Sequence, residues 1–222
     1  MKIGSIFLLL LFCVLSVFAT ADSIQTIPIS GEAWKGQPDI CCFNGDFSIS
    51  GPGLSLFQGT PDGPSNIGSC DLNAVCDFSF TIYSAATFCT YCTAYSGGSL
   101  GGKTADFLDA TLTFTGSAFY SGSGTTTAVP MTVSGTIIGY QLVNCSPDGV
   151  GCSLGPAQFT LSIVGQGIGT FFFPEPGFGE VLGTDTTFTG TATVVPEPTS
   201  LLLTGSGLVG LLLRRKLTST WV

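Results

Sequence analysis

The segment that decides the fold reads Leu-Asp-Ala-Thr-Leu-Thr-Phe-Thr at residues 108–115. Apolar and polar side chains alternate at every step, which is the period of a strand with one buried face and one face in water. A helix would instead place apolar residues three and four apart. The same alternation recurs through most of the chain, so the sequence predicts an all-β protein.

Outward from this segment, further strands follow the same pattern. They are predicted around residues 77–82, 131–137, 159–163 and 187–194, with weaker candidates at 47–49, 54–56 and 170–173. Turns rich in Gly, Pro, Ser and Asp separate them. Because a single sheet would leave its apolar face in water, we expect an antiparallel, jelly-roll-like β-sandwich of about seven to nine strands.

Two near copies occur within these strands, Thr-Phe-Thr-Gly-Ser-Ala at 113–118 and Thr-Phe-Thr-Gly-Thr-Ala at 187–192. Thr and Phe suit a pleated surface, and Gly permits a bulge or bend. We interpret the copies as convergent strand sequences, since two copies do not make a repeat architecture.

The charge content excludes several classes of protein. Only 9% of the 222 residues are charged and none is His, which removes Ser-His-Asp and Cys-His catalysis and histidine metal sites. Between Asp22 and Val195 there are thirteen acidic residues and two basic ones, Lys35 and Lys103, which gives a net charge of −11. Such a body repels nucleic acid and anionic lipid. We interpret the acidity as a solubility feature, leave calcium at an acidic loop open, and expect no other cofactor or metal.

The N-terminus is typical of a secretory signal. Lys2 precedes an apolar run from Ile3 to Phe18, and Ala19-Thr20-Ala21 has the small-x-small form of a cleavage site. Residues 1–21 are therefore predicted to be a signal peptide, with the apolar run as its helix, and residues 22–194 to be the β-sandwich domain.

The C-terminus has three elements in a fixed order. Val195 introduces Pro196-Glu197-Pro198, an apolar stretch follows at 199–213, and Arg214-Arg215-Lys216 ends it. The stretch predicts a short transmembrane helix, and its basic flank stays cytoplasmic, which leaves the body outside the membrane.

This tail, about residues 195–216, resembles the PEP-CTERM sorting signal of exported proteins of Gram-negative bacteria. The resemblance rests on Pro196, Glu197 and Pro198 for the motif and on Arg214 and Arg215 for the stop. It implies recognition by a membrane enzyme called exosortase, inner-membrane anchoring before processing, and a final place on the outer envelope surface or in the extracellular matrix. It also implies a link to exopolysaccharide and biofilm.

Eight of the nine cysteines remain after the predicted signal is removed, namely Cys41, Cys42, Cys70, Cys76, Cys89, Cys92, Cys145 and Cys152. Export to an oxidising compartment favours up to four disulfides, with many pairings open. The turn sequence Pro-Asp-Gly between Cys145 and Cys152 favours that pair. A four-thiolate zinc site from Cys89, Cys92 and the vicinal Cys41 and Cys42 is a less favoured alternative. A redox pair at Cys89 and Cys92 is another.

Other chemical motifs are weak. Residues 97–104 match the literal P-loop pattern but lead into a strand, so we interpret them as a mobile connection between sheets. Carboxylate pairs at Asp106 and Asp109, or at Glu175 and Glu180, are candidates for glycoside hydrolysis without a supporting context. Trp34 lies outside the recognised strands and is assigned a packing role in preference to sugar stacking.

The sequence therefore predicts a disulfide-bonded, exported envelope or matrix protein with a structural or interaction role and no enzymatic activity. A carbohydrate-binding module is the main alternative, and a glycan-active enzyme is the weaker one. The expected partners are an exosortase-type enzyme, the membrane and an extracellular polysaccharide, but no nucleic acid.

Overall fold

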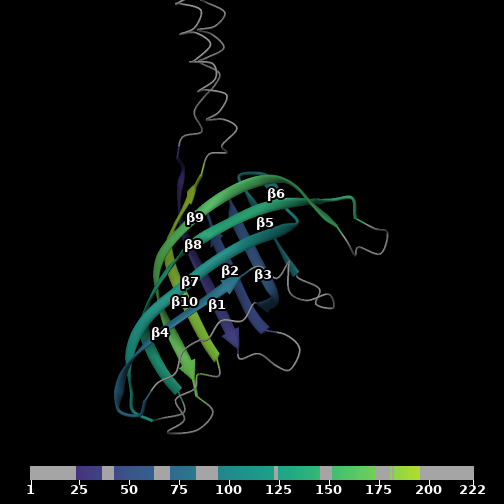
Figure 1. Cartoon of the computed structure of the whole chain (residues 1–222). Coiled ribbons are helices and arrows are strands. Elements are labelled where there is room, and N and C mark those ends of the chain that lie inside the picture. Colours follow the sequence, from purple (N-terminus) through teal and green to yellow (C-terminus); the bar gives the residue numbers. More distant parts are fainter. Residues whose placement is uncertain are drawn as a thin grey trace, which may run out of the picture. The chain divides into compact units, whose positions relative to one another are not determined.

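The computed structural model describes residues 24–36, 43–62, 71–83, 95–122, 125–145, 152–173, 181 and 183–195. Within these ranges the chain forms ten strands, drawn in Figure 1: β1 (Thr26–Gly36), β2 (Phe43–Gly51), β3 (Leu54–Asp62), β4 (Ala74–Tyr83), β5 (Tyr95–Leu100), β6 (Lys103–Ala105), β7 (Phe107–Tyr120), β8 (Thr125–Val143), β9 (Ser153–Phe172) and β10 (Gly183–Val194). The all-β prediction is confirmed. The signal helix at 1–21 and the helix at 199–213 lie outside the described residues.

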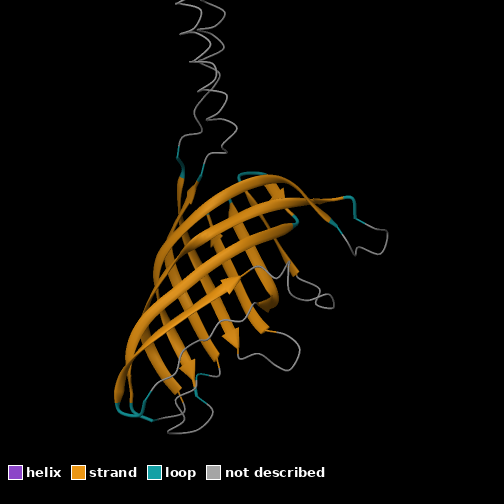
Figure 2. Cartoon of the chain, in the orientation of Figure 1, coloured by secondary structure: helices purple, strands orange, loops and turns teal. Residues whose placement is uncertain are grey.

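All ten strands belong to one antiparallel sheet in the order β4-β7-β8-β9-β10-β1-β2-β3-β5-β6. The expected sandwich of two sheets with seven to nine strands is wrong, because the ten strands form one sheet. The jelly-roll-like order is also wrong, because most strands that pair in the sheet follow one another in the sequence. Figures 1 and 2 show the long strands β7, β8 and β9 arching over β10, β1, β2 and β3. The reason is geometric: a strongly twisted sheet can curl until its own two halves cover each other. One sheet thereby buries its apolar face.

The alternation found in the sequence sets the core. Phe78, Phe80 and Ile82 of β4 and Leu108, Leu112 and Phe114 of β7 are all buried, while the residues between them face outward. The near copies meet here, because the Phe114 ring lies 5.6 Å edge-on from the Phe188 ring of β10. Phe80 also stacks on Phe114, with the ring centroids 4.7 Å apart. The two similar segments, 113–118 and 187–192, thus each supply one ring to a packing contact between the two halves of the curled sheet.

Buried polar side chains tie the free edge of β4 to the opposite half of the sheet. Lys35 of β1 is 1% exposed, and its Nζ donates to the Thr81 carbonyl at 2.8 Å. Gln58 of β3 is 2% exposed, and its Nε2 donates to the Tyr83 carbonyl at 2.9 Å. An edge strand offers unpaired carbonyls that invite another chain. Here side chains of the same chain occupy two of them.

Turn chemistry explains two of the hairpins. Between β2 and β3, Pro52 is followed by Gly53 at φ +70°, the arrangement of a type II turn. Between β5 and β6, Gly101 and Gly102 have φ values of +56° and +87°, which suits a two-residue hairpin loop. The expected mobile connection at residues 97–104 is therefore wrong for this segment. It pairs as a hairpin, with Leu100 opposite Lys103.

Candidate functional site

The outer face of the sheet carries a row of hydroxyl side chains that crosses all ten strands. Each member is the register partner of the next, and every member except Gln166 bears a hydroxyl group. We call this the hydroxyl row, and its members from β4 to β6 are Ser79, Thr115, Thr132, Gln166, Thr189, Ser30, Ser50, Ser55, Ser99 and Thr104. All are exposed except Ser99, which is half-buried.

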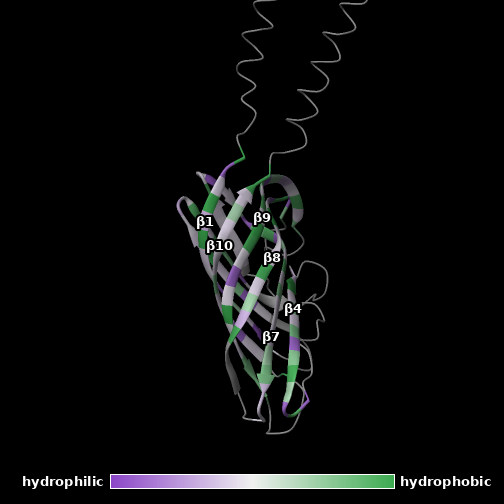
Figure 3. Cartoon of the chain, turned by 90° about the vertical axis from the view of Figure 1, so that its left-hand side faces the viewer, coloured by the Kyte–Doolittle hydropathy of each residue, from purple (hydrophilic) through white to green (hydrophobic). Residues whose placement is uncertain are grey.

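The row arises because each strand places a polar residue at the same level of the sheet. Figure 3 shows β1, β10, β9 and β8 side by side, with hydropathy changing in bands along each strand. Adjacent hydroxyls also contact one another: Thr115 and Thr132 lie 2.7 Å apart and Ser30 and Ser50 lie 3.3 Å apart, oxygen to oxygen. Cross-strand hydroxyl pairs of this kind stabilise a sheet modestly. A hydroxyl that makes one such bond keeps further donor or acceptor capacity.

A second row runs parallel to the first, four residues further along each strand. From β4 to β1 its members are Tyr83, Thr111, Thr136, Ser162, Thr193 and Thr26. The outer face of the central strands therefore carries two parallel rows of polar residues with few charges, beside the exposed apolar side chains Val164 and Ile168 of β9.

A shallow groove of about 640 Å³ interrupts this surface where the hydroxyl row crosses β9, β10, β1 and β2. Its lining residues are Ser30, Gly31, Glu32, Ser48, Ser50, Gln166, Gly167, Ile168, Thr187, Phe188 and Thr189. Glu32 supplies a carboxylate, Gln166 an amide, and Ile168, which is 57% exposed, an apolar surface. The groove thus combines many hydrogen-bonding groups with one aliphatic side chain.

Two glycines shape the middle of the groove. Gly31 and Gly167 are the register partners of Phe188 on either side. A Cβ at Gly31 would lie 2.8 Å from Phe188 Cε1, and a Cβ at Gly167 would lie 2.8 Å from Phe188 Cβ. Since real Cβ atoms do not approach this closely, glycine at both positions leaves room for the buried Phe188 side chain.

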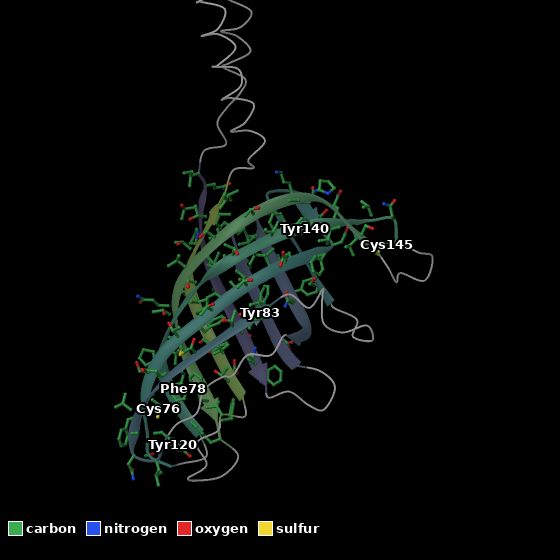
Figure 4. All side chains as sticks on the ribbon, in the orientation of Figure 1. Cys76, Phe78, Tyr83, Tyr120, Tyr140 and Cys145 are labelled. Atoms are coloured by element: carbon green, nitrogen blue, oxygen red, sulfur yellow. A yellow bond between two sulfur atoms is a disulfide. The ribbon has the colours of Figure 1, made fainter. Side chains whose placement is uncertain are left out.

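The cysteines predicted to form disulfides are resolved in part. Cys145 and Cys152 are joined by a disulfide, as the turn between them predicted. Cys76 is also disulfide-bonded, and Figure 4 places it at the opposite end of the sheet from Cys145. The other predicted cysteines, Cys41, Cys42, Cys70, Cys89 and Cys92, lie outside the described residues.

The carboxylates predicted as candidates for glycoside hydrolysis are only partly described by the structure. The Asp106 carboxylate accepts a hydrogen bond from the Leu142 amide at 3.2 Å, and Asp109 is exposed one strand position away from the core. Glu175 and Glu180 lie outside the described residues. Within the described ranges, no three His, Cys, Asp or Glu side chains gather as metal ligands would.

Trp34 is placed differently from the prediction. It belongs to β1 and its side chain is 39% exposed on the outer face, above Gly36. Its neighbours in register are Asp46 and Asp185. It is therefore a partly covered surface aromatic residue.

The described domain is a curled all-β sheet, and the tail beyond it matches a known sorting motif. Residues 194–216 match the family described as the PEP-CTERM protein-sorting motif. The chain carries a PEP-CTERM sorting tail, as its residues predicted, and this motif implies export, membrane-anchored sorting and processing by an exosortase-type enzyme. Neither a curated protein nor a solved structure matches the chain.

The individual sorting residues Pro196, Glu197, Pro198, Arg214 and Arg215 lie outside the described residues. Among the residues that are described, no helix has the length and apolarity needed to cross a membrane.

Proposed function

We propose that the chain is an exported, exosortase-processed protein of the outer envelope surface or extracellular matrix, with a structural or interaction role linked to exopolysaccharide and biofilm. The observation that carries this proposal is the PEP-CTERM motif at residues 194–216. The domain itself acts without catalysis.

The physical properties of the tail support this proposal. Pro on either side of Glu197 disfavours a helical conformation, which suits a motif that a processing enzyme must recognise. As a helix, residues 199–213 would be about 22 Å long at about 1.5 Å per residue, against a hydrocarbon core of about 30 Å. Such a short span anchors weakly, which suits a temporary anchor. Arg214, Arg215 and Lys216 hold its end in the cytoplasm.

The structure of the body supports a role outside the cell. A disulfide joins Cys145 to Cys152, and disulfides persist in oxidising compartments. The side chains of Lys35 and Gln58 occupy carbonyls of the β4 edge, and β6 is a three-residue edge strand. Short or occupied edges resist pairing with other chains. These features favour a domain that meets its partners through its faces.

The second candidate is a carbohydrate-binding module, and the groove across β9, β10, β1 and β2 favours it. A glycan-active enzyme is a weaker candidate. Glycoside hydrolysis uses two carboxyl groups about the scissile bond, and the groove lining contains one, Glu32.

Expression of the full chain in hosts with and without an exosortase tests the proposed function. We expect the protein in the surface or matrix fraction only when the exosortase is present, and in the inner-membrane fraction otherwise. A variant with Pro196-Glu197-Pro198 replaced by three alanines should remain in the inner membrane in both hosts. The internal copy Pro174-Glu175-Pro176 provides the matched control, since its replacement should not alter the fractionation. The proposal fails if the wild-type protein fractionates identically in both hosts.

A further inference from the structure

We infer that the groove across β9, β10, β1 and β2 binds a segment of a neutral polysaccharide, which lies along the hydroxyl row and perpendicular to the strands. This inference rests on the proposed function, because it names the ligand class that the exported domain meets.

The chemistry of the lining matches a sugar chain. A sugar ring presents hydroxyl groups around its edge and C–H groups on its faces. The groove offers hydroxyls from Ser30, Ser48 and Thr189 and an amide from Gln166, beside the 57% exposed side chain of Ile168. Ligand sites in general combine apolar contact with a few polar groups that fix orientation, and this groove is the more polar kind, with hydrogen-bonding groups around one exposed aliphatic side chain.

The dimensions favour a chain over a single sugar. The groove spans four adjacent strands, and neighbouring strands lie about 4.8 Å apart, so it extends about 14 Å across the sheet. This length exceeds one sugar ring. The hydroxyl row continues beyond the groove through Thr132 and Thr115 on one side and through Ser55 and Ser99 on the other. A polymer that leaves the groove at either end therefore meets further hydroxyl groups.

The charge of the domain selects among polysaccharides. The lining contains the carboxylate of Glu32 and no Lys or Arg. The body between Asp22 and Val195 carries a net charge of −11. An anionic polymer would be repelled from the groove at short range and from the domain at long range. A neutral polymer pays no such penalty, and the Glu32 carboxylate can accept hydrogen bonds from its hydroxyls.

Affinity electrophoresis of the full chain, in a mild non-ionic detergent under non-reducing conditions, tests the inference. The probes cast in the gel are hydroxyethylcellulose, galactomannan and dextran as neutral polymers, and alginate as the anionic one. We expect at least one neutral polymer to retard the protein and alginate to leave its mobility unchanged.

Two matched pairs of variants localise the site. Thr189 lines the groove and Thr191 does not, although both are exposed on the outer face of β10. On β9, Ile168 lines the groove and Val164 does not, and their side chains are 57% and 60% exposed. We expect Thr189→Ala and Ile168→Ala each to weaken the apparent affinity about three- to tenfold, the effect of one lost hydrogen bond or apolar contact. Thr191→Ala and Val164→Ala should bind as the wild type does.

The inference is overturned if no neutral polymer retards the protein, if alginate retards it as strongly, or if the control variants lose as much affinity as the groove variants. The assay contains no exosortase and reads no localisation. A failure of sorting would therefore leave the binding result standing, and a failure of binding would leave the sorting result standing.

Discussion

Truncation of Phe114 to Ala should be among the most damaging single changes in the domain. Its side chain is 0% exposed, and its ring stacks on Phe80 at 4.7 Å and meets Phe188 edge-on at 5.6 Å. Loss of a buried Phe side chain costs about 3–5 kcal/mol, and each aromatic contact adds about 0.5–1.5 kcal/mol beyond its buried area. Because Phe114 bridges the two halves of the curled sheet, we expect a loss toward the upper end, about 4–5 kcal/mol.

Urea unfolding followed by near-ultraviolet circular dichroism measures this loss. With a slope of about 2 kcal/mol per M, the midpoint should fall by about 2 M. Phe119→Ala is the matched control, because Phe119 lies on the same strand, β7, but faces outward and is 56% exposed. Its midpoint should move by about 0.5 M at most. A similar shift for both variants would refute the inside-and-outside assignment of β7, and a shift below about 0.5 M for Phe114→Ala would refute the bridging role.

Three further changes test other parts of the fold by the same urea assay. Lys35→Met removes a buried donor to a β4 carbonyl and should lower the free energy of unfolding by about 1–3 kcal/mol. As the control, Lys103→Met at the exposed end of β6 should change it by at most about 0.5 kcal/mol. Equal losses for the two variants would contradict the role of Lys35 at the β4 edge. Gly101→Ala at φ +56° should cost about 1–2 kcal/mol, and Gly101→Asn clearly less, so an equal cost for both would show that the left-handed turn is not the cause. Paired replacement of Cys145 and Cys152 by Ala should cost about 2.5 kcal/mol, the chain-entropy value for so short a loop. An unchanged midpoint would argue against that bond as a stabilising feature.

Alternation of apolar and polar residues was sufficient to predict the strands that form the core. Within Leu108–Phe114 and Phe78–Ile82, every second residue is buried, as the alternation predicts. The alternation gives the buried face of each strand but not its neighbours, since strand pairing depends on residues far apart in the sequence. For this reason the sequence could not distinguish two packed sheets from one sheet that curls over itself.

Two segments were missed because their local signals point elsewhere. In β1, Lys35 is a charged residue at an inward position, and its burial is explained only by the carbonyl it meets on β4. In β5 and β6, six glycines and serines in a short span suggest a flexible loop. The Gly101-Gly102 pair in fact suits a tight hairpin between paired strands.

The candidate site was less accessible to sequence reasoning than the tail. The tail carries its residues consecutively, so Pro196-Glu197-Pro198, the apolar stretch and Arg214-Arg215 can be recognised as one motif. The hydroxyl row takes one residue from each of ten strands, and no window of sequence contains more than a few of its members. Only the abundance of Ser and Thr at outward positions hinted at it, and the register was needed to align them.

Delivery of this domain by its PEP-CTERM tail can be tested by intact mass spectrometry of the purified protein. The full chain is expressed in hosts with and without an exosortase, and the membrane-bound and released forms are weighed. We expect the segment following the motif at residues 196–198 to be lost only where the exosortase is present, while the mass of the body stays the same. An intact tail in both hosts, or the same truncated mass in both, would contradict it.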